Sequence, residues 1–167
     1  MKFQLEEGRP GHEEWALRLA EVVAQRATCL RRSVGCVLTN ERNQVVATGY
    51  NGRAAGLKHC NDWGTSSQNG RTYPHACAGA RAASGTQLDA CEAIHAEQNA
   101  LLQCGDVYSI ASCYVTVSPC VTCVKLLMNT GCKRIIFRER YAHDEAARLL
   151  WAGQEYRDGR QWLHLPG

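Results

Sequence analysis

A histidine, a glutamate and two cysteines carry the spacing of a catalytic metal centre. His95 and Glu97 stand two positions apart, and further along the chain Cys120 and Cys123 stand three apart, directly after a proline. Catalytic zinc takes three protein ligands and keeps a fourth position for water. One imidazole and two thiolates supply three ligands, which leaves Glu97 free to carry protons between water and a leaving group. We therefore predict zinc on His95, Cys120 and Cys123, with Glu97 as the proton carrier.

This spacing also restricts where the metal can lie. Cys120 and Cys123 fit the first turn of one helix, with Pro119 at its first position, and a helix N-terminus favours thiolates. His95 and Glu97 point roughly 200° apart on a helix of 3.6 residues per turn. They can serve one ion only if it lies off the N-terminal end of their helix. The expected geometry is two helix N-termini that face one ion.

The combined pattern is more specific than its parts. A lone C-x-x-C pair is also typical of a structural zinc site or a redox pair, and a lone H-x-E indicates nothing. H-x-E followed by P-C-x-x-C, with a glutamate that does not bind the metal, is the pattern of zinc-dependent base deaminases. A structural site would use a fourth protein ligand and would not require Glu97.

Helices and strands must position these residues, and their periodicity predicts an α/β fold. The hairpin strands should be antiparallel, and the later strands, which alternate with helices, should be parallel. The chain of 167 residues is then one domain, 1–167, with a single mixed five-stranded sheet and helices on both faces. The expected elements are a helix over 12–28, strands over 33–40 and 44–52, a long loop over 53–90, a helix over 95–104, a strand over 112–118, a helix over 119–131, a strand over 133–139, a helix over 143–153 and a short strand over 161–165.

The helices should bury their apolar residues. Counting these at helical spacing gives the residues that should face the core: Trp15, Leu19, Val22 and Val23 in the first helix, Ala96, Ala100, Leu101 and Cys104 in the second, and Ala146, Leu149 and Leu150 in the last. Gly131 is expected to end the third helix.

Composition excludes several classes of protein. No stretch approaches the roughly 20 apolar residues of a membrane span, and the acidic N-terminal residues do not form a secretory signal, so we expect a cytoplasmic protein. The formal net charge of +3 and the 7% aromatic content disfavour a nucleic-acid partner. In a reducing compartment, grouped cysteines among the ten indicate metal and scattered ones indicate core packing.

The chain resembles the deoxycytidylate (dCMP) deaminases within the zinc-dependent cytidine deaminase superfamily. The resemblance rests on RRSVGCVL, GYNG, CEAIHAEQNALLQC, YVTVSPCVTC and KRIIF, which occur in family order from about Cys29 to Tyr141. HAEQNA and SPCVTC are specific to the superfamily, whereas GYNG with HAEQNALL points to the dCMP branch. The resemblance implies a three-layer α/β/α cytidine-deaminase-like fold and hydrolysis of dCMP to dUMP and ammonia, which feeds thymidylate synthesis. It also implies a homohexamer that dCTP activates and dTTP inhibits.

The resemblance also implies roles for single residues around the substrate. Asn51 would contact the sugar or base, the backbone of Ala96 would hold the pyrimidine carbonyl, and Ser118 would lie beside the amine. Tyr141 would close over the base. Asn51 is equally explained as a turn residue before Gly52, and Tyr141 as an amphipathic residue at a strand end. Candidate phosphate contacts are Arg31, Arg32, Ser33 and Arg140.

Some relatives carry a second, structural zinc, whose early ligands match Cys29 and Cys60. The remaining positions differ here, since Ala93 stands where a relative has a carboxylate. Cys77 and Cys91 are the available substitutes, with His59 and His75 in reserve. Such a site would hold the long loop, and the alternative is four free cysteines. The cysteines expected to fill the core are Cys36, Cys104, Cys113 and Cys132. Arg53, Lys58 and His59 would bind an effector triphosphate or simply be solvated.

Three rival functions remain at this point. The metal motif sets the reaction but not the substrate, so dCTP, cytidine or a 5-substituted dCMP compete with dCMP. Deaminases of tRNA or single-stranded DNA share the motif but need a basic, aromatic groove. A non-catalytic module with this fold would be expected to lack the glutamate, and Glu97 is present.

Overall fold

The computed structural model describes residues 8–62, 64–66, 70–83, 85–153 and 159–167. Within these residues no helix is both long and apolar enough to cross a bilayer.

Short 3₁₀ helices lie at Ala78–Arg81, Leu88–Ala90 and Val107–Ser109. The helices and strands, in chain order, are α1 (His12–Ala24), β1 (Gly35–Thr39), β2 (Val45–Tyr50), β3 (Gly52–Arg53), β4 (Gly64–Ser66), β5 (Gly70–Thr72), β6 (Ala93–Ile94), α2 (Ala96–Gln103), β7 (Ser112–Val117), α3 (Val121–Met128), β8 (Arg134–Glu139), α4 (Glu145–Ala152) and β9 (Gln161–His164).

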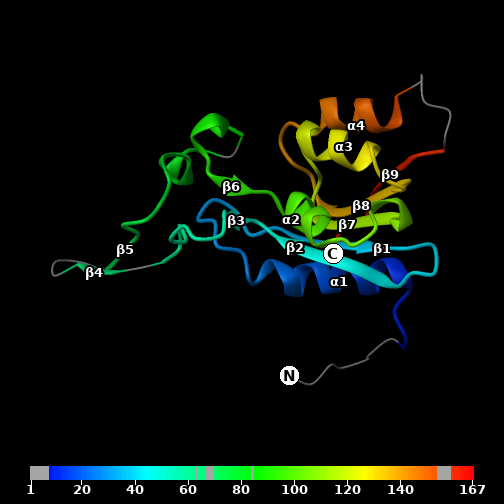
Figure 1. Ribbon diagram of the computed structural model, residues 1–167, viewed down its shortest axis with the longest axis horizontal. Coiled ribbons are helices and arrows are strands. Elements are labelled where there is room, and N and C mark those ends of the chain that lie inside the picture. Colours follow the sequence, from blue (N-terminus) through cyan, green and yellow to red (C-terminus); the bar gives the residue numbers. More distant parts are fainter. Residues whose placement is uncertain (1–7, 63, 67–69, 84, 154–158) are drawn as a thin grey trace.

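A five-stranded mixed sheet forms the centre of the molecule, as the sequence predicts. Its strand order is β2-β1-β7-β8-β9. β1 is antiparallel to β2 and β7, whereas β7, β8 and β9 are parallel to one another. α1 covers one face of the sheet, and α2, α3 and α4 cover the other (Figure 1). The three-layer α/β/α fold is therefore confirmed.

The two faces of the sheet bury two rows of apolar side chains, because successive residues of a strand point to opposite faces. Val37, Tyr114, Ile136 and Leu163 stand opposite one another across four strands and pack under α1. The next row, Leu38, Cys113, Ile135 and Trp162, packs under the other three helices. This second core also contains Cys36 and Cys132, so three of the four cysteines predicted to fill the core do so, whereas Cys104 is half-buried at the end of α2.

Two helices approach the hairpin strands at backbone distance, and this decides which faces they bury. A Cβ added to Gly35 would lie 2.0 Å from the carbonyl oxygen of Ala20, and one added to Gly49 would lie 2.3 Å from that of Ala96. Only small residues fit such contacts. α1 therefore buries Ala16, Leu17, Ala20 and Ala24. The predicted face was wrong in part: Leu19 and Val23 are half-buried and pack against this core as expected, whereas Trp15 is 42% and Val22 46% exposed.

Details of three other helices also differ from the prediction. α3 begins at Val121 with Cys120 as its N-cap, so Pro119 lies outside the helix rather than at its first position. It ends at Met128, and Gly131 instead allows a close approach to the carbonyl oxygen of Tyr108. α4 buries Ala147 and Trp151, whereas Ala146 and Leu149, expected inside, are exposed. Leu101 of α2 and Leu150 of α4 are half-buried.

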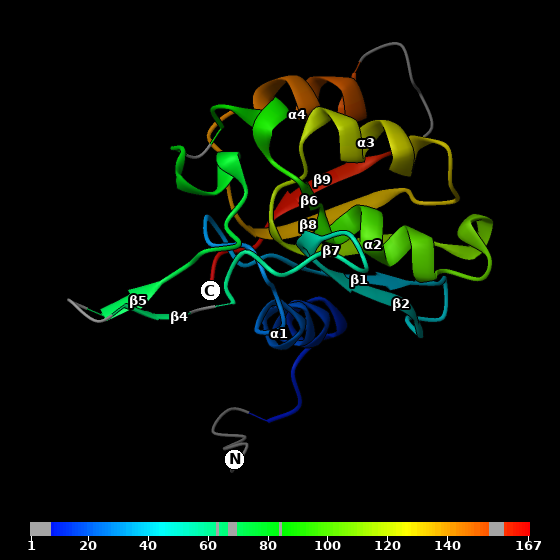
Figure 2. The same ribbon diagram turned by 60° about the vertical axis from the view of Figure 1, so that its left-hand side comes forward.

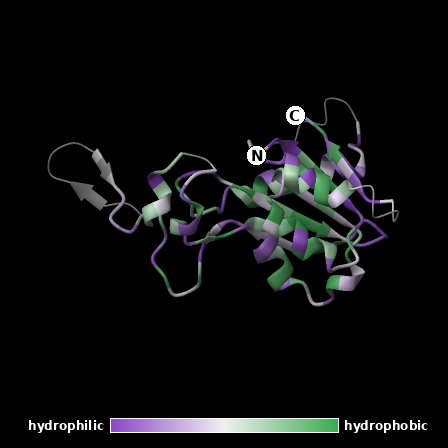
Figure 3. Ribbon diagram, turned by 90° about the horizontal axis from the view of Figure 1, so that it is seen from above, coloured by the Kyte–Doolittle hydropathy of each residue, from purple (hydrophilic) through white to green (hydrophobic). Residues whose placement is uncertain are grey.

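The segment between β2 and α2 leaves the compact body. The β4–β5 hairpin extends away from the sheet, and the chain then returns through two 3₁₀ helices to β6 (Figure 2). Hydrophobic residues concentrate in the body rather than along this extension (Figure 3). The expected long loop over 53–90 is thus replaced by short elements. A small cluster of Cys60, Cys77 and Ala80 is its own buried core.

Candidate active site

The two helix N-termini meet as the sequence spacing requires. His95 is the N-cap of α2 and Cys120 is the N-cap of α3, both with extended backbone. The backbone N–H of His95 donates to Oε1 of Gln98 at 2.8 Å, which fixes the first turn of α2. Because α2 packs against Gly49, its N-terminus is held at the end of the sheet where β7 leads into α3.

Three ligand atoms form a triangle of zinc dimensions. The Sγ atoms of Cys120 and Cys123 lie 3.7 Å apart, and they lie 3.5 and 3.4 Å from Nδ1 of His95. A tetrahedral zinc with bonds of about 2.3 Å to sulfur and about 2.0 Å to nitrogen requires edges of about 3.8 and 3.5 Å. These are also the only three residues, among those described, whose ligand atoms are grouped closely enough for a metal ion. The donor set therefore fits zinc without rearrangement.

The charges at this centre favour a cation. Hydrogen bonding with Cys123, reinforced by the His95 imidazole, lowers the pKa of Cys120 to about 3, so Cys120 is a thiolate at neutral pH. The same contact raises the pKa of the buried Cys123 thiol. Two thiolates this close repel each other, so loss of the second proton is favoured by a cation between them.

Glu97 lies beside the metal triangle but outside it. Its side chain is 4% exposed, and burial raises the pKa of its carboxyl group. A raised pKa makes the protonated and deprotonated forms of the carboxyl group more similar in free energy at neutral pH. This suits a group that must accept a proton and then return it. The geometry thus agrees with a proton carrier that does not bind the metal.

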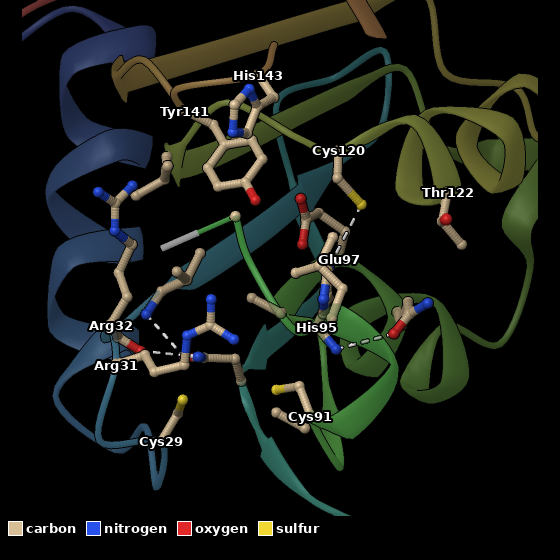
Figure 4. A pocket seen from close by; sticks show the side chains of 18 of the residues that line it. Cys29, Arg31, Arg32, Cys91, His95, Glu97, Cys120, Thr122, Tyr141 and His143 are labelled. Carbon is tan, nitrogen blue, oxygen red and sulfur yellow. Dashed lines mark hydrogen bonds between the residues drawn. The ribbon is translucent and has the colours of Figure 1, made fainter. Parts of the chain in front are cut away.

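A cavity of about 640 Å³ opens in front of the centre (Figure 4). Its size falls in the ordinary range for small-molecule sites. His95, Glu97 and Cys120 lie at one side of it, and Arg31 and Arg32 lie at another (Figure 4). The remaining lining residues are Cys29, Val34, Asn51, Gly85, Leu88, Asp89, Cys91, Ala93, Ala96, Gln98, Val117, Ser118, Val121, Thr122, Tyr141 and His143.

The residues assigned to the substrate by resemblance mostly line this cavity. Asn51, Ala96, Ser118 and Tyr141 do so, whereas Ser33 is exposed and stands outside the lining. The amide of Asn51 already has two partners, because its Oδ1 accepts from Val34 N–H and its Nδ2 donates to the carbonyl of Arg32, both at 2.8 Å. Asn51 therefore shapes the segment that carries the arginines.

The neighbouring arginines are used differently. Nη2 of Arg31 donates to the carbonyl oxygens of Ala83 and Thr86, at 2.7 and 3.2 Å. These bonds connect the body to the far end of the segment between β2 and α2, which we call the insert. Nη1 of Arg32 is buried and has no hydrogen-bond partner among the described residues. A buried, unpartnered guanidinium nitrogen beside a cavity indicates an anionic ligand. Arg140, also proposed for phosphate, is exposed outside the lining.

The four cysteines considered for a second zinc are neighbours, but their ligand atoms do not form a site here. Asn61 N–H donates to Thr28 O at 3.2 Å, which brings Cys60 near Cys29, and Cys77 N–H lies 3.4 Å from Cys60 Sγ. A Cβ on Gly79 would meet Cα of Cys91 at 2.8 Å. Even so, among the described residues no three of these four sulfur atoms lie within 4.8 Å of one another.

Several lining residues were not singled out from the sequence. His143 packs edge-to-face on Tyr141, with ring centroids 5.8 Å apart. A Cβ added to Gly85 would lie 2.6 Å from the His143 ring and 3.2 Å from the Tyr141 hydroxyl. Leu88 and Asp89 come from the same returning segment. The positive φ of Gly85, +81°, explains why glycine stands there. No sequence periodicity in this segment predicts that Gly85 lies against His143 and Tyr141.

Sequence comparisons point in one direction. The profile described as "Cytidine and deoxycytidylate deaminase zinc-binding region" matches residues 10–139. Deoxycytidylate deaminase of Schizosaccharomyces pombe is 35% identical over 153 residues, which is 89% of this chain and 44% of that protein. Deoxycytidylate deaminase of Mycobacterium phage D29 is 37% identical over 135 residues, 77% of this chain and 95% of that protein. The chain spans less than half the length of its Schizosaccharomyces pombe and Saccharomyces cerevisiae relatives, 44% and 40% respectively.

Solved structures share the fold. The apo dCMP deaminase of cyanophage S-TIM5 aligns with a TM-score of 0.64 at 20% identity, over 94% of this chain and 99% of that one. The same cyanophage enzyme in complex with dCMP and dUMP aligns with a TM-score of 0.61 at 23% identity, over 93% and 98% of the two chains. At these identities the similarity establishes the three-layer fold.

Proposed function

Because the chain belongs to the cytidine and deoxycytidylate deaminase zinc-binding family, we propose that it hydrolyses dCMP to dUMP and ammonia. The observation that carries the reaction is the zinc-sized triangle of His95, Cys120 and Cys123 with buried Glu97 beside it. The observation that supports a contact with the substrate phosphate is that Nη1 of Arg32, a residue of the cavity lining, has no partner within the described ranges.

In the proposed mechanism Glu97 handles every proton. Zinc bound to the three ligands would act as a Lewis acid that lowers the pKa of a water molecule. Glu97 accepts one proton from this water as its oxygen attacks C4 of the pyrimidine, and delivers that proton to N3. Glu97 then takes the remaining proton of the former water from the hydroxyl group on C4 and transfers it to the amino group, so that the C4–N bond breaks, C4 becomes a carbonyl and ammonia leaves. One water is consumed, and the base becomes a uracil.

The cavity wall supports the choice of a free nucleotide. The backbone of Ala96, first residue of α2, lies beside the reacting centre and can hold the pyrimidine carbonyl. The Tyr141 side chain points into the cavity, where it can cover the base (Figure 4). The relatives in Schizosaccharomyces pombe and phage D29 are named deoxycytidylate deaminases, and the cyanophage enzyme binds dCMP and dUMP.

The deciding experiment compares substrates. Ammonia release is measured with dCMP, dCTP, CMP, deoxycytidine, a 5-substituted dCMP, and oligonucleotides of single-stranded DNA and tRNA. We expect the highest kcat/KM with dCMP. Fastest turnover of dCTP or of the 5-substituted nucleotide would replace dCMP with that substrate, and activity confined to an oligonucleotide would overturn the small-molecule assignment.

A variant tests the phosphate contact separately. Arg32→Ala should raise KM for dCMP by about 10- to 100-fold, the effect of losing a charge-assisted hydrogen bond, and should leave KM for deoxycytidine unchanged. Arg42→Ala, an exposed arginine in the β1–β2 turn, is the matched control and should change neither value. Equal effects on both substrates would remove Arg32 from the phosphate site.

A second, structural zinc on Cys29, Cys60, Cys77 and Cys91 is a finer part of the proposal. The proposal is supported by the short distances between the backbones of these four cysteines. Their side chains would have to rotate to bring the four sulfur atoms around one ion. We expect two zinc ions per chain in protein purified without chelator, and one in the Cys60→Ser variant. One zinc in the unaltered protein would exclude this site.

Assembly and regulation complete the proposal. Leu102 and Tyr108, 76% and 78% exposed, are apolar side chains that contact between subunits would cover. Sedimentation should give a homohexamer, and a monomer would contradict it.

We also propose that the activity is regulated. The plot of rate against dCMP concentration should then be sigmoidal, dCTP should make it hyperbolic, and dTTP should inhibit the reaction. Arg53 is not free for an effector, since it binds the carbonyls of Lys58 and His75 and pairs with Glu92. Lys58 and His59 are exposed and could contact an effector.

We further propose that the reaction takes place in the cytoplasm, where all ten cysteines would stay reduced.

A further inference from the structure

A buried carboxylate stands behind the cavity wall. Asp144, the N-cap residue of α4, is 8% exposed and is not part of the cavity lining. Its Oδ2 accepts a hydrogen bond from Oγ of Ser118 at 3.1 Å, and both side chains are buried. A buried carboxylate is expensive to desolvate, so its partner and its purpose need an explanation. The reaction proposed above does not use Asp144.

The hydroxyl of Ser118 is fixed in direction by two contacts. Its oxygen accepts from the backbone N–H of Tyr141 at 2.7 Å. A backbone N–H can only donate, so the single hydroxyl proton of Ser118 is left for Asp144. The N–H of Asp144 in turn donates to the carbonyl of Tyr141 at 3.1 Å, which closes the turn from Tyr141 to Asp144 onto Ser118.

This clamp connects two parts of the site. On one side, Ser118 is followed by Pro119 and the zinc ligand Cys120, and its own N–H donates to the carbonyl of Glu139 at 2.8 Å. On the other side, the clamped turn carries the rings of Tyr141 and His143, which lie over the cavity (Figure 4). The position of these rings relative to the metal centre therefore depends on the hydroxyl direction that Asp144 sets.

We propose that Asp144 is a positioning residue, which acts through the Ser118 hydroxyl to hold Tyr141 over the bound base. The proposal rests on the deaminase function given above. Without the carboxylate, the Ser118 hydroxyl loses its acceptor and rotates, and the Tyr141 N–H loses a well-aligned partner. The rings then shift relative to the metal centre, while His95, Cys120 and Cys123 keep their positions.

Kinetics and hydrogen exchange test this together. Asp144→Ala should lower kcat/KM for dCMP by about 10- to 100-fold, as for a lost hydrogen bond to a charged group, with unchanged zinc content. Asp144→Asn should recover much of the activity, because its amide oxygen still accepts the hydroxyl proton. Ser118→Ala should match Asp144→Ala, and the double variant should be no worse than either, since the residues act as one unit. The Tyr141 amide should exchange with solvent faster in Asp144→Ala than in the unaltered protein.

A matched control separates positioning from general stability. Asp106 also caps a backbone turn, through an acceptor bond from Tyr108 N–H at 2.9 Å, but lies outside the cavity lining. Asp106→Ala should leave kcat/KM unchanged. Additive losses in the double variant, no recovery in Asp144→Asn, or unchanged exchange at Tyr141 would each overturn the positioning role. Absence of deaminase activity in the unaltered protein would instead overturn the proposed function, and the exchange rates would still show whether Asp144 holds Tyr141.

Discussion

The body of the molecule and the insert between β2 and α2 contribute to the same cavity by different means. The body holds the metal ligands on two helix N-termini, which are fixed by a sheet whose central residues are fully buried. The insert contributes Gly85, Leu88, Asp89 and Cys91 to the cavity from segments with short strands and a small core of its own.

The difference indicates a division of labour. Reacting groups need positions fixed to a fraction of an ångström, which dense packing provides. The insert is held to the body by polar contacts, among them Arg31 with Ala83 and Thr86, and by the close approach of Gly85 to the His143 ring and the Tyr141 hydroxyl. Variants in the body should therefore change catalysis and stability, and variants in the insert should change substrate binding.

The largest effect is expected at Glu97. Glu97→Gln removes the proton carrier, and kcat for dCMP should fall by about 10²- to 10⁴-fold. Zinc content should stay the same, because Glu97 lies outside the ligand triangle. Asp89→Asn changes the cavity carboxylate of the insert and should lower kcat by less than about tenfold, whereas exposed Glu41→Gln is a neutral control. Ammonia release and zinc analysis provide the readouts, and an active Glu97→Gln enzyme would falsify the catalytic assignment.

Stability should show the same contrast. Leu127 of α3 is fully buried in the core of the body, and Leu127→Ala should lower the free energy of unfolding by about 2–5 kcal/mol. Leu88 of the insert is 56% exposed, and Leu88→Ala should change it by less than about 0.5 kcal/mol. Urea unfolding of the zinc-loaded proteins measures both values. Similar losses would mean that the insert belongs to the same cooperative unit as the body.

A pair of glycines tests the contact between the two regions. A Cβ on Gly85 would lie 2.6 Å from the His143 ring, whereas a Cβ on Gly56 meets no atom of the described residues within 4 Å. Both have positive φ, +81° and +87°, so Gly→Ala adds similar backbone strain at each. Gly85→Ala should raise KM for dCMP by about tenfold, since overpacking of this kind costs about 1–3 kcal/mol, and Gly56→Ala should not. Equal KM values for the two variants would show that substrate binding does not depend on the contact between Gly85 and His143.

The metal centre could be predicted from the sequence because its geometry is local. His95 with Glu97, and Cys120 with Cys123, each sit within one helical turn, and zinc chemistry limits how two such turns can meet. The mixed sheet followed from the same kind of signal, since alternating strands and helices constrain their own pairing.

The errors came from contacts between distant residues. Trp15 and Val22 look like the buried face of α1, but the backbone of Gly35 admits only small residues such as Ala20. Arg31 and Arg32 are indistinguishable in the sequence. Only the fold shows that Arg31 binds the insert, while Arg32 lines the cavity and its buried Nη1 finds no partner in the part of the chain that the structure describes. A pattern of residue types does not contain that information.

The smallest effect concerns the attachment of α1 to the body in acid. Arg138 and, less strongly, Arg18 hold the pKa of Glu14 at about 2, against an ordinary value of 4.5. Because the folded-state pKa is the lower one, the stabilisation is complete above pH 4.5 and is lost as the pH falls toward 2. Glu14 is 37% exposed, so solvent screening limits the contribution to roughly 1 kcal/mol. Glu14→Gln should therefore unfold more easily than the unaltered protein at pH 7 and equally easily near pH 2, as urea titrations at both pH values can measure. A difference that persists in acid would mean that Glu14 stabilises α1 by packing rather than by its charge.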